Sequence, residues 1–123
     1  MIGAVIAIAV GSLDGIDVDR LLSAIAEVEG HQWSDPGGKY AFTERTWRQH
    51  TKRDYQYACS PPLGEQVARA HLAWLAAQLK AYSYPVTAYT LAACWNLGFA
   101  GYRRRVAVLD YAVRVTNIYE AEK

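Results

Sequence analysis

The sequence contains little that would connect it to metal, nucleotide or nucleic-acid chemistry. Its three histidines and two cysteines have no spacing typical of a metal site, so we expect no metal and no cofactor. A net charge of +1 provides no broad positive surface for nucleic acid. Neither a glycine-rich phosphate loop nor a nucleophile elbow is present. The remaining candidates are a binding protein and an enzyme that acts through its own side chains.

Long apolar runs are also missing. Met1 to Val10 is fully apolar, but a membrane-spanning helix needs about 20 such residues, so we expect no membrane span. The run has the length of the apolar part of a secretory signal, although no Lys or Arg precedes it. We interpret residues 1–16 as an N-terminal segment left from a signal, with a terminal element packed on the domain as the alternative. Cys59 and Cys94 permit one disulfide and require none.

Aromatic residues are abundant instead. The chain of 123 residues, with 52% hydrophobic and 20% charged residues, is the size and composition of one soluble domain, here residues 17–123. Nine tyrosines and four tryptophans are many for this length. Some of them belong to the core, and a surplus also suits a carbohydrate groove, because sugar rings stack on aromatic faces.

The hydrophobic periodicity predicts an all-α fold. Helices are expected over about 18–29, 44–50, 61–81, 88–97 and 106–120, the first three following Asp17, Thr43 and Ser60, which are good N-cap residues. We expect a small β excursion at Lys39 to Phe42 and loops elsewhere. In the 61–81 helix the predicted buried stripe is Val67, Ala70, Trp74, Leu75 and Leu79.

Glu29 is the first candidate site residue. At about 100° per residue it continues the apolar row of the first helix, whereas Glu27 faces water. Gly30 then ends the helix. Desolvation disfavours a charged carboxylate, so Glu29 could be a general acid that is protonated near neutral pH. A carboxylate that caps a loop through backbone N–H groups is an equally good interpretation of this stretch alone.

Three motifs follow one another in a recognisable order. They are AIAEVEG, then GKYAFTERTW, then AACWNLG followed by DYAVRVTNIY. The series resembles the lysozyme-like lytic transglycosylases of the SLT type, which have Val-Glu-Ser, Gly-Leu-Met-Gln, Ala-Tyr-Asn-Ala-Gly and a final helix with a Tyr-…-Arg-Val-…-Tyr pattern. The resemblance covers about residues 21–119 and implies a lysozyme-like single domain. Each motif alone is weakly specific, and their shared order and spacing carry the comparison.

The resemblance implies a role for each matching position. Glu29 takes the place of the catalytic glutamate, and Tyr40 and Phe42 lie in the segment that lines the groove opposite it. Trp95 and Asn96 match the Tyr-Asn pair that faces the saccharide. Tyr111 matches the aromatic residue of the final helix near the acid. A core Trp95 and a helix-capping Asn96 are the structural alternatives for that pair.

The implied reaction is cleavage of peptidoglycan between N-acetylmuramic acid and N-acetylglucosamine, with one glutamate performing both proton transfers. The implied partner is a peptidoglycan glycan strand, the implied location is periplasmic or secreted, and we expect a monomer. Gly30 stands where the family has Ser, and Ala41 where it has a groove-lining Gln. A hydrolytic lysozyme using Asp35 or Glu44 as a second carboxylate, and a non-catalytic wall-binding protein of the same fold, remain as alternatives.

Overall fold

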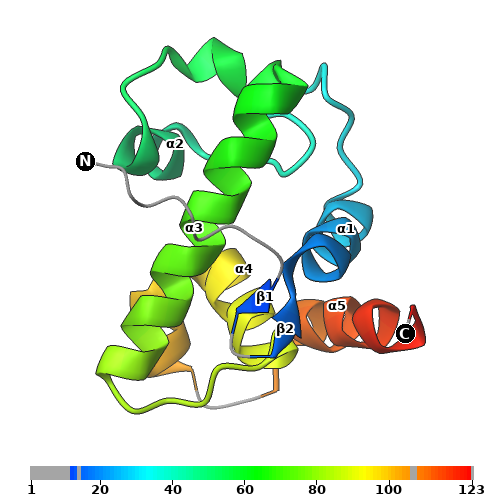
Figure 1. Ribbon diagram of the computed structural model, residues 1–123, viewed down its shortest axis with the longest axis vertical. Coiled ribbons are helices and arrows are strands. Elements are labelled where there is room, and N and C mark those ends of the chain that lie inside the picture. The colour runs from blue at the N-terminus through cyan, green and yellow to red at the C-terminus, as the bar shows by residue number, and fades with distance from the viewer. Residues whose placement is uncertain (1–11, 14, 106–107, 123) are drawn as a thin grey trace.

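A computed structural model of the chain describes residues 12–13, 15–105 and 108–122 (Figure 1). In these residues the fold is all-α, as the periodicity predicts. The helices are α1 (Val18–Glu29), α2 (Glu44–His50), α3 (Pro61–Ala81), α4 (Ala88–Arg104) and α5 (Asp110–Ala121), with a 3₁₀-helix η2 (Tyr55–Cys59). Most of the expected signal segment, residues 1–11, lies outside the described residues.

The β excursion lies elsewhere than expected. β1 (Ser12–Leu13) and β2 (Ile16–Asp17) pair antiparallel, with Leu13 opposite Ile16. Ile16 is buried in the core, so the hairpin straddles the expected boundary between residues 16 and 17. Lys39 to Phe42, the predicted extended piece, is a series of turns, and that prediction was wrong.

Helix ends follow the capping residues. The Asp17 carboxylate accepts from the Arg20 N–H and starts α1, and Thr43 does the same for α2. Thr87 and Thr90 form a reciprocal capping box at the start of α4. Ser60 precedes α3, but its side chain makes no capping bond. The prolines in the first turn of α3 explain why the helix begins there even so.

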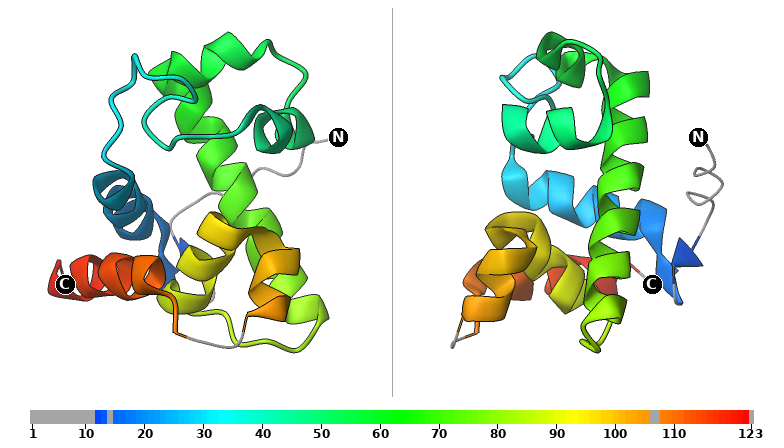
Figure 2. Two further views of the ribbon diagram at one scale, coloured as in Figure 1. Left: turned by 180° about the vertical axis from the view of Figure 1, so that it is seen from behind. Right: turned by 90° about the vertical axis from the view of Figure 1, so that its left-hand side faces the viewer.

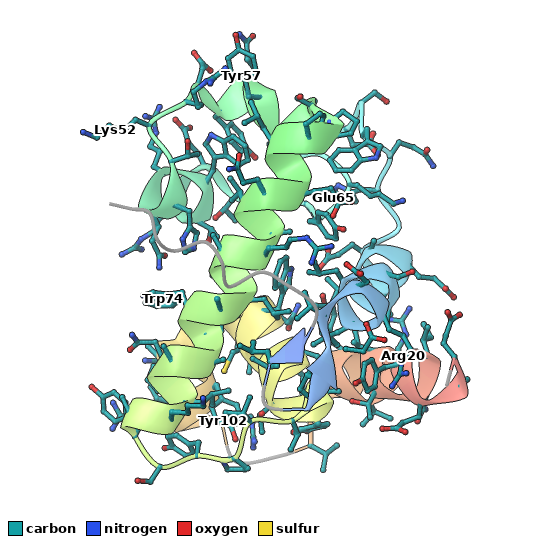
Figure 3. All side chains as sticks on the ribbon, in the orientation of Figure 1. Arg20, Lys52, Tyr57, Glu65, Trp74 and Tyr102 are labelled. Atoms are coloured by element: carbon teal, nitrogen blue, oxygen red, sulfur yellow. The ribbon has the colours of Figure 1, made fainter. Side chains whose placement is uncertain are left out.

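Helix α3 runs the length of the fold; α2, η2 and α4 pack against it, and α5 packs on α4 and α1 (Figures 1 and 2). Its buried side is wider than the predicted stripe and consists of Gly64, Val67, Ala68, His71, Leu72, Leu75, Ala76 and Leu79. Ala70 and Trp74 are exposed, so their predicted burial was wrong. Figure 3 shows Trp74 and Glu65 leaving α3 on opposite sides.

Helices α1 and α5 lie side by side and run antiparallel (Figure 1). At the start of α1 the Asp17 N–H donates to the Tyr119 hydroxyl at 3.0 Å, and the Arg20 guanidinium lies 4.0 Å from the centre of the Tyr119 ring. At the other end of α1 the Tyr111 hydroxyl donates to Glu29. Two tyrosines of one helix therefore hold both ends of the other.

The chain between α4 and α5 departs from the expected helix start at Val106. Residues 106–107 lie outside the described part, and Val108 and Leu109 are not helical. The Leu109 N–H donates to the Tyr89 hydroxyl at 2.9 Å, and Leu109 has the extended backbone of an N-cap residue. This tie to α4 delays the start of α5 to Asp110. Both cysteines are free thiols, as the sequence permits.

Candidate active site

The helical phase of α1 distinguishes its two glutamates as predicted. Glu29 is half-buried at the last residue of the helix, and Glu27 is exposed. Gly30 follows in the left-handed region with φ 71°, and its N–H donates to the Ala26 carbonyl. Glycine is the residue that adopts this conformation without cost, which explains why Gly30 ends the helix. The chain can then turn away sharply and leave the Glu29 side chain at an open helix end.

Tyr111 orients the carboxyl group of Glu29. Its hydroxyl donates to Oε2 of Glu29 at 2.7 Å. Burial, this hydrogen bond and the charge of Glu29 all raise the pKa of Tyr111 above its usual value, so the phenol remains a protonated donor. The other oxygen, Oε1, is left to contact a ligand. The alternative in which Glu29 caps a loop through backbone N–H groups is not seen among the described residues.

The segment 37–42 brings two aromatic residues to Glu29 through a tight turn. Gly37 and Gly38 both have positive φ, and the Phe42 N–H donates back to the Gly37 carbonyl at 3.1 Å. A Cβ on Gly38 would lie 1.9 Å from the Ala58 carbonyl oxygen, so no other residue fits there. This turn, rather than a strand, buries the side chains of Tyr40 and Phe42. Ala41 lies between them with φ 54°.

Trp95 and Asn96 reach the same place from α4. The Trp95 ring lies 6.1 Å from the ring of Tyr40 and 5.8 Å from that of Phe42, centre to centre. Asn96 is exposed and makes no side-chain hydrogen bond within the described residues, so it does not act as the alternative helix cap. Gly98, the predicted end of this helix, has non-helical backbone angles (φ 78°, ψ 159°) and breaks α4 into two helical stretches.

These residues enclose one pocket of about 180 Å³, which we call the glutamate pocket. Its apolar lining is Tyr40, Ala41, Phe42 and Trp95. Its polar lining is Glu29, Thr43, Thr46, His71 and Asn96. The structure therefore brings five of the six predicted site residues to one cavity, and the sixth, Tyr111, is bonded to its acid. Their roles in binding and catalysis stay predictions.

His71, Thr43 and Thr46 also line the pocket and were not among the predicted site residues, and His71 is the one of them that is buried. It belongs to the buried side of α3 and is 7% exposed. Its Nδ1 lies 2.8 Å from Nε2 of His50 on α2. Burial, with a smaller effect of His50, lowers the pKa of His71 to about 3. The available signal was its position four residues after Val67 and four before Leu75, within the apolar stripe.

The two candidates for a second carboxylate are engaged outside the glutamate pocket. Asp35 accepts a hydrogen bond from the Gln32 N–H at 2.7 Å in the loop after α1. Glu44 accepts from Nε of Arg48 at 2.8 Å on the exposed face of α2. Neither lines the pocket, so Glu29 is its one acid among the residues described.

A second and larger pocket, of about 310 Å³, adjoins the first across Tyr40. We call it the ion-pair pocket; its charged lining is Asp19, Lys39, Glu65 and Arg69. Asp19 and Arg69 form an ion pair between α1 and α3, and the Tyr40 hydroxyl donates to Glu65 at 2.9 Å. The ion-pair pocket therefore also has a glutamate, Glu65, but this glutamate lies among charged side chains.

Three further observations bear on function. Among the described residues, no cluster of His, Cys, Asp and Glu could hold a metal ion. In the same part of the chain, no helix has both the length and the apolar character required to cross a bilayer. Comparison of the chain with protein-family models, curated proteins and solved structures finds no match. The geometry of the glutamate pocket is therefore the basis for inferring a function.

Proposed function

We propose that this protein cleaves the glycan strand of peptidoglycan between N-acetylmuramic acid and N-acetylglucosamine, as a lytic transglycosylase with Glu29 as its catalytic acid and base. One observation carries the proposal. In the described chain, the glutamate pocket has a single carboxyl group, set among aromatic rings and beside an amide side chain. That combination suits a sugar chain, since aromatic faces take apolar sugar surfaces and the amide takes hydroxyl or acetamido groups.

The proposed reaction needs one group that gives and then takes a proton. Glu29, through Oε1, protonates the glycosidic oxygen as the bond to the muramoyl anomeric carbon breaks. The same carboxylate then accepts the proton of the muramoyl C6 hydroxyl, whose oxygen attacks that carbon and closes a 1,6-anhydro ring. Tyr111 keeps its hydrogen bond to Oε2 throughout and so fixes the direction of Oε1. No water enters the balance, and no second carboxylate is required.

The hydrolytic alternative is less well supported by the geometry. A glycosidase that uses water or a covalent intermediate places its two carboxyl groups about 5 to 9.5 Å apart across the bond. Asp35 and Glu44 would have to leave their present partners, Gln32 and Arg48, to take that position. We therefore place the lyase first.

The wall-binding alternative is based on the departures from the family pattern at Gly30 and Ala41. The left-handed φ of 71° at Gly30 gives a structural reason for glycine at that position. Ala41, whose methyl group makes no hydrogen bond, lacks the polar contact that the family's Gln would offer, and this difference leaves the carboxyl group of Glu29 unchanged. Neither departure disables Glu29, and we propose an enzyme of the cell envelope, periplasmic or secreted.

Mass analysis of the products from purified peptidoglycan tests the proposal. We expect muropeptides with 1,6-anhydro ends, which are lighter by one water than reducing ends. Reducing ends would establish the hydrolase, and retention on peptidoglycan without products would establish the binding protein. Glu29→Gln serves as the matched control, since it keeps the size of the side chain and removes the proton donor.

A further inference from the structure

The glutamate pocket offers few polar groups that are free to bind a ligand. Thr43 and Thr46 are bonded to each other, because the Thr43 hydroxyl accepts from the Thr46 N–H and donates to its hydroxyl, both at 3.1 Å. Ala41 has no polar side chain. The groups that remain are the Thr46 O–H, which those two bonds leave as a donor, Glu29 from α1, Asn96 from α4 and His71 from α3.

The ring of His71 is held on three sides. Nδ1 bonds to His50 at 2.8 Å, the ring stacks on Trp74 at an angle of 12°, and its edge meets Trp95 with ring centres 5.0 Å apart. A side chain that is 7% exposed and has these three contacts is held in one orientation before any ligand arrives. Nδ1 is occupied, so Nε2 is the one ring nitrogen that can serve the pocket.

Both histidines are neutral in this arrangement. Burial lowers the pKa of His50, and burial together with His50 lowers that of His71 to about 3. In a neutral pair one ring must donate across the His50–His71 bond and the other must accept. If His50 donates, Nε2 of His71 carries the proton and is a donor toward the pocket. If His71 donates, its Nε2 is an acceptor.

We propose that His71 is a saccharide-binding residue whose Nε2 hydrogen-bonds a hydroxyl or acetamido group in the glutamate pocket, and that His50 positions it. The inference rests on the proposed function and adds the residue that supplies the polar contact missing at Ala41. A coupled change of tautomer in the two rings lets Nε2 meet either an acceptor or a donor. Sugar hydroxyls and acetamido groups present both kinds, so the pair matches this class of ligand.

Two isosteric substitutions separate binding from support. In His71→Gln the terminal amide replaces Nε2, and the bond to His50 is lost. In His71→Asn the amide replaces Nδ1, so the bond to His50 is kept and the pocket loses its polar group. With tetra-N-acetylchitotetraose as the probe, we expect His71→Asn to raise the dissociation constant by roughly threefold to tenfold. This is the effect of losing one neutral hydrogen bond. We expect His71→Gln, which keeps the polar group but loses the bond that positions it, to bind more tightly than His71→Asn and less tightly than the parent.

If His71→Asn bound the saccharide like the parent and His71→Gln bound it more weakly, His71 would only support the fold. Equal affinity of all three proteins would show that His71 has no role in binding. Imidazole ¹⁵N spectra give a second readout, in which the saccharide should shift the Nε2 signal of His71 more than its Nδ1 signal. Cleavage of peptidoglycan by the parent protein is measured in parallel. Cleavage with no His71 effect overturns only this inference, whereas a parent that neither cleaves nor binds the saccharide overturns both proposals.

Discussion

The two adjoining pockets differ less in size than in how their acids are partnered. In the larger ion-pair pocket, Asp19 is paired with Arg69, and Glu65 accepts from Tyr40 beside two cationic residues. In the smaller glutamate pocket, Glu29 has a neutral phenol as its partner, and within the described residues no cation pairs with it.

The difference shows why the smaller cavity is the better candidate for proton transfer. In the ion-pair pocket, Asp19 is already bound to Arg69, and Lys39 also lines the cavity, so its acids face cations rather than an apolar wall. In the glutamate pocket, Glu29 is bonded to Tyr111 through one oxygen only and lies beside aromatic rings that a sugar could cover. Volume alone would have pointed to the ion-pair pocket.

Glu29→Gln tests the comparison most directly. General acid–base catalysis is worth about a hundredfold to ten-thousandfold in rate, so we expect cleavage of peptidoglycan to fall by that factor. The fold should survive, because the side chain keeps its size and can still accept from Tyr111. Turnover is measured on purified peptidoglycan, and circular dichroism confirms folding.

Glu65→Gln in the ion-pair pocket and Glu27→Gln on the exposed side of α1 are the matched controls, and both should cleave normally. If either control abolishes cleavage while Glu29→Gln retains it, the assignment of the catalytic acid is wrong.

The buried base of the glutamate pocket predicts a pH dependence of stability. His71 has a pKa of about 3 in the folded protein, against 6.5 for a free histidine. As the pH falls below about 6.5, His71 therefore binds a proton in the unfolded chain but stays neutral in the folded protein. This group leaves the free energy of unfolding unchanged above that pH and lowers it as the pH falls toward 3, by on the order of 5 kcal/mol in all.

Urea unfolding at several pH values between 7 and 4 measures this loss. His71→Gln has no such proton to bind, so its free energy of unfolding should fall less steeply over the same range. Parallel slopes for the two proteins would show that His71 titrates normally in the fold.

Tyr111→Phe sharpens the comparison, since it removes the neutral partner of Glu29 and leaves the ring. A hydrogen bond to a charged group is worth about 1.5–3 kcal/mol, which corresponds to roughly a tenfold to hundredfold loss in turnover. Tyr119→Phe removes the corresponding hydroxyl at the other end of α1, outside both pockets, and should leave turnover unchanged. Equal losses in the two variants would indicate a general effect on packing.

The smallest effects are expected for the acids outside both pockets. Asp35→Asn and Glu44→Gln should each retain most of the parent turnover, because neither carboxylate lines the glutamate pocket. A loss greater than about a hundredfold from one of them, roughly 2.7 kcal/mol of barrier, would favour the two-carboxylate hydrolase.

Local patterns in the sequence predict much of the helical framework. The Asp17 cap, the apolar row of α1 and Gly30 define a helix whose bounds match the structure. The same row distinguishes Glu29 from Glu27, because 100° per residue is a property of the helix itself. Thr43 and Gly98 likewise mark a start and a break through their own backbone preferences.

Features that depend on distant contacts could not be predicted in this way. The turn at 37–42 follows from the close approach of Gly38 to Ala58, twenty residues away. The Asp-Gly pair at 14–15 is a local hairpin signal that was passed over, because residues 1–16 were interpreted as a segment left from a secretory signal. His71 was missed because the buried stripe was chosen by residue type, and its partner His50 lies on another helix.

The antiparallel pairing of α1 and α5 has a consequence for the order of folding. The two contacts that hold α1 join residues 82 and 102 positions apart, Tyr111 with Glu29 and Tyr119 with Asp17. Contacts of such high sequence separation form late, because a long loop must close first. During synthesis from the N-terminus, a nascent chain can assemble α1, the 37–42 turn and α3 while Glu29 still lacks its tyrosine. The acid is therefore oriented only after α5 has emerged and docked.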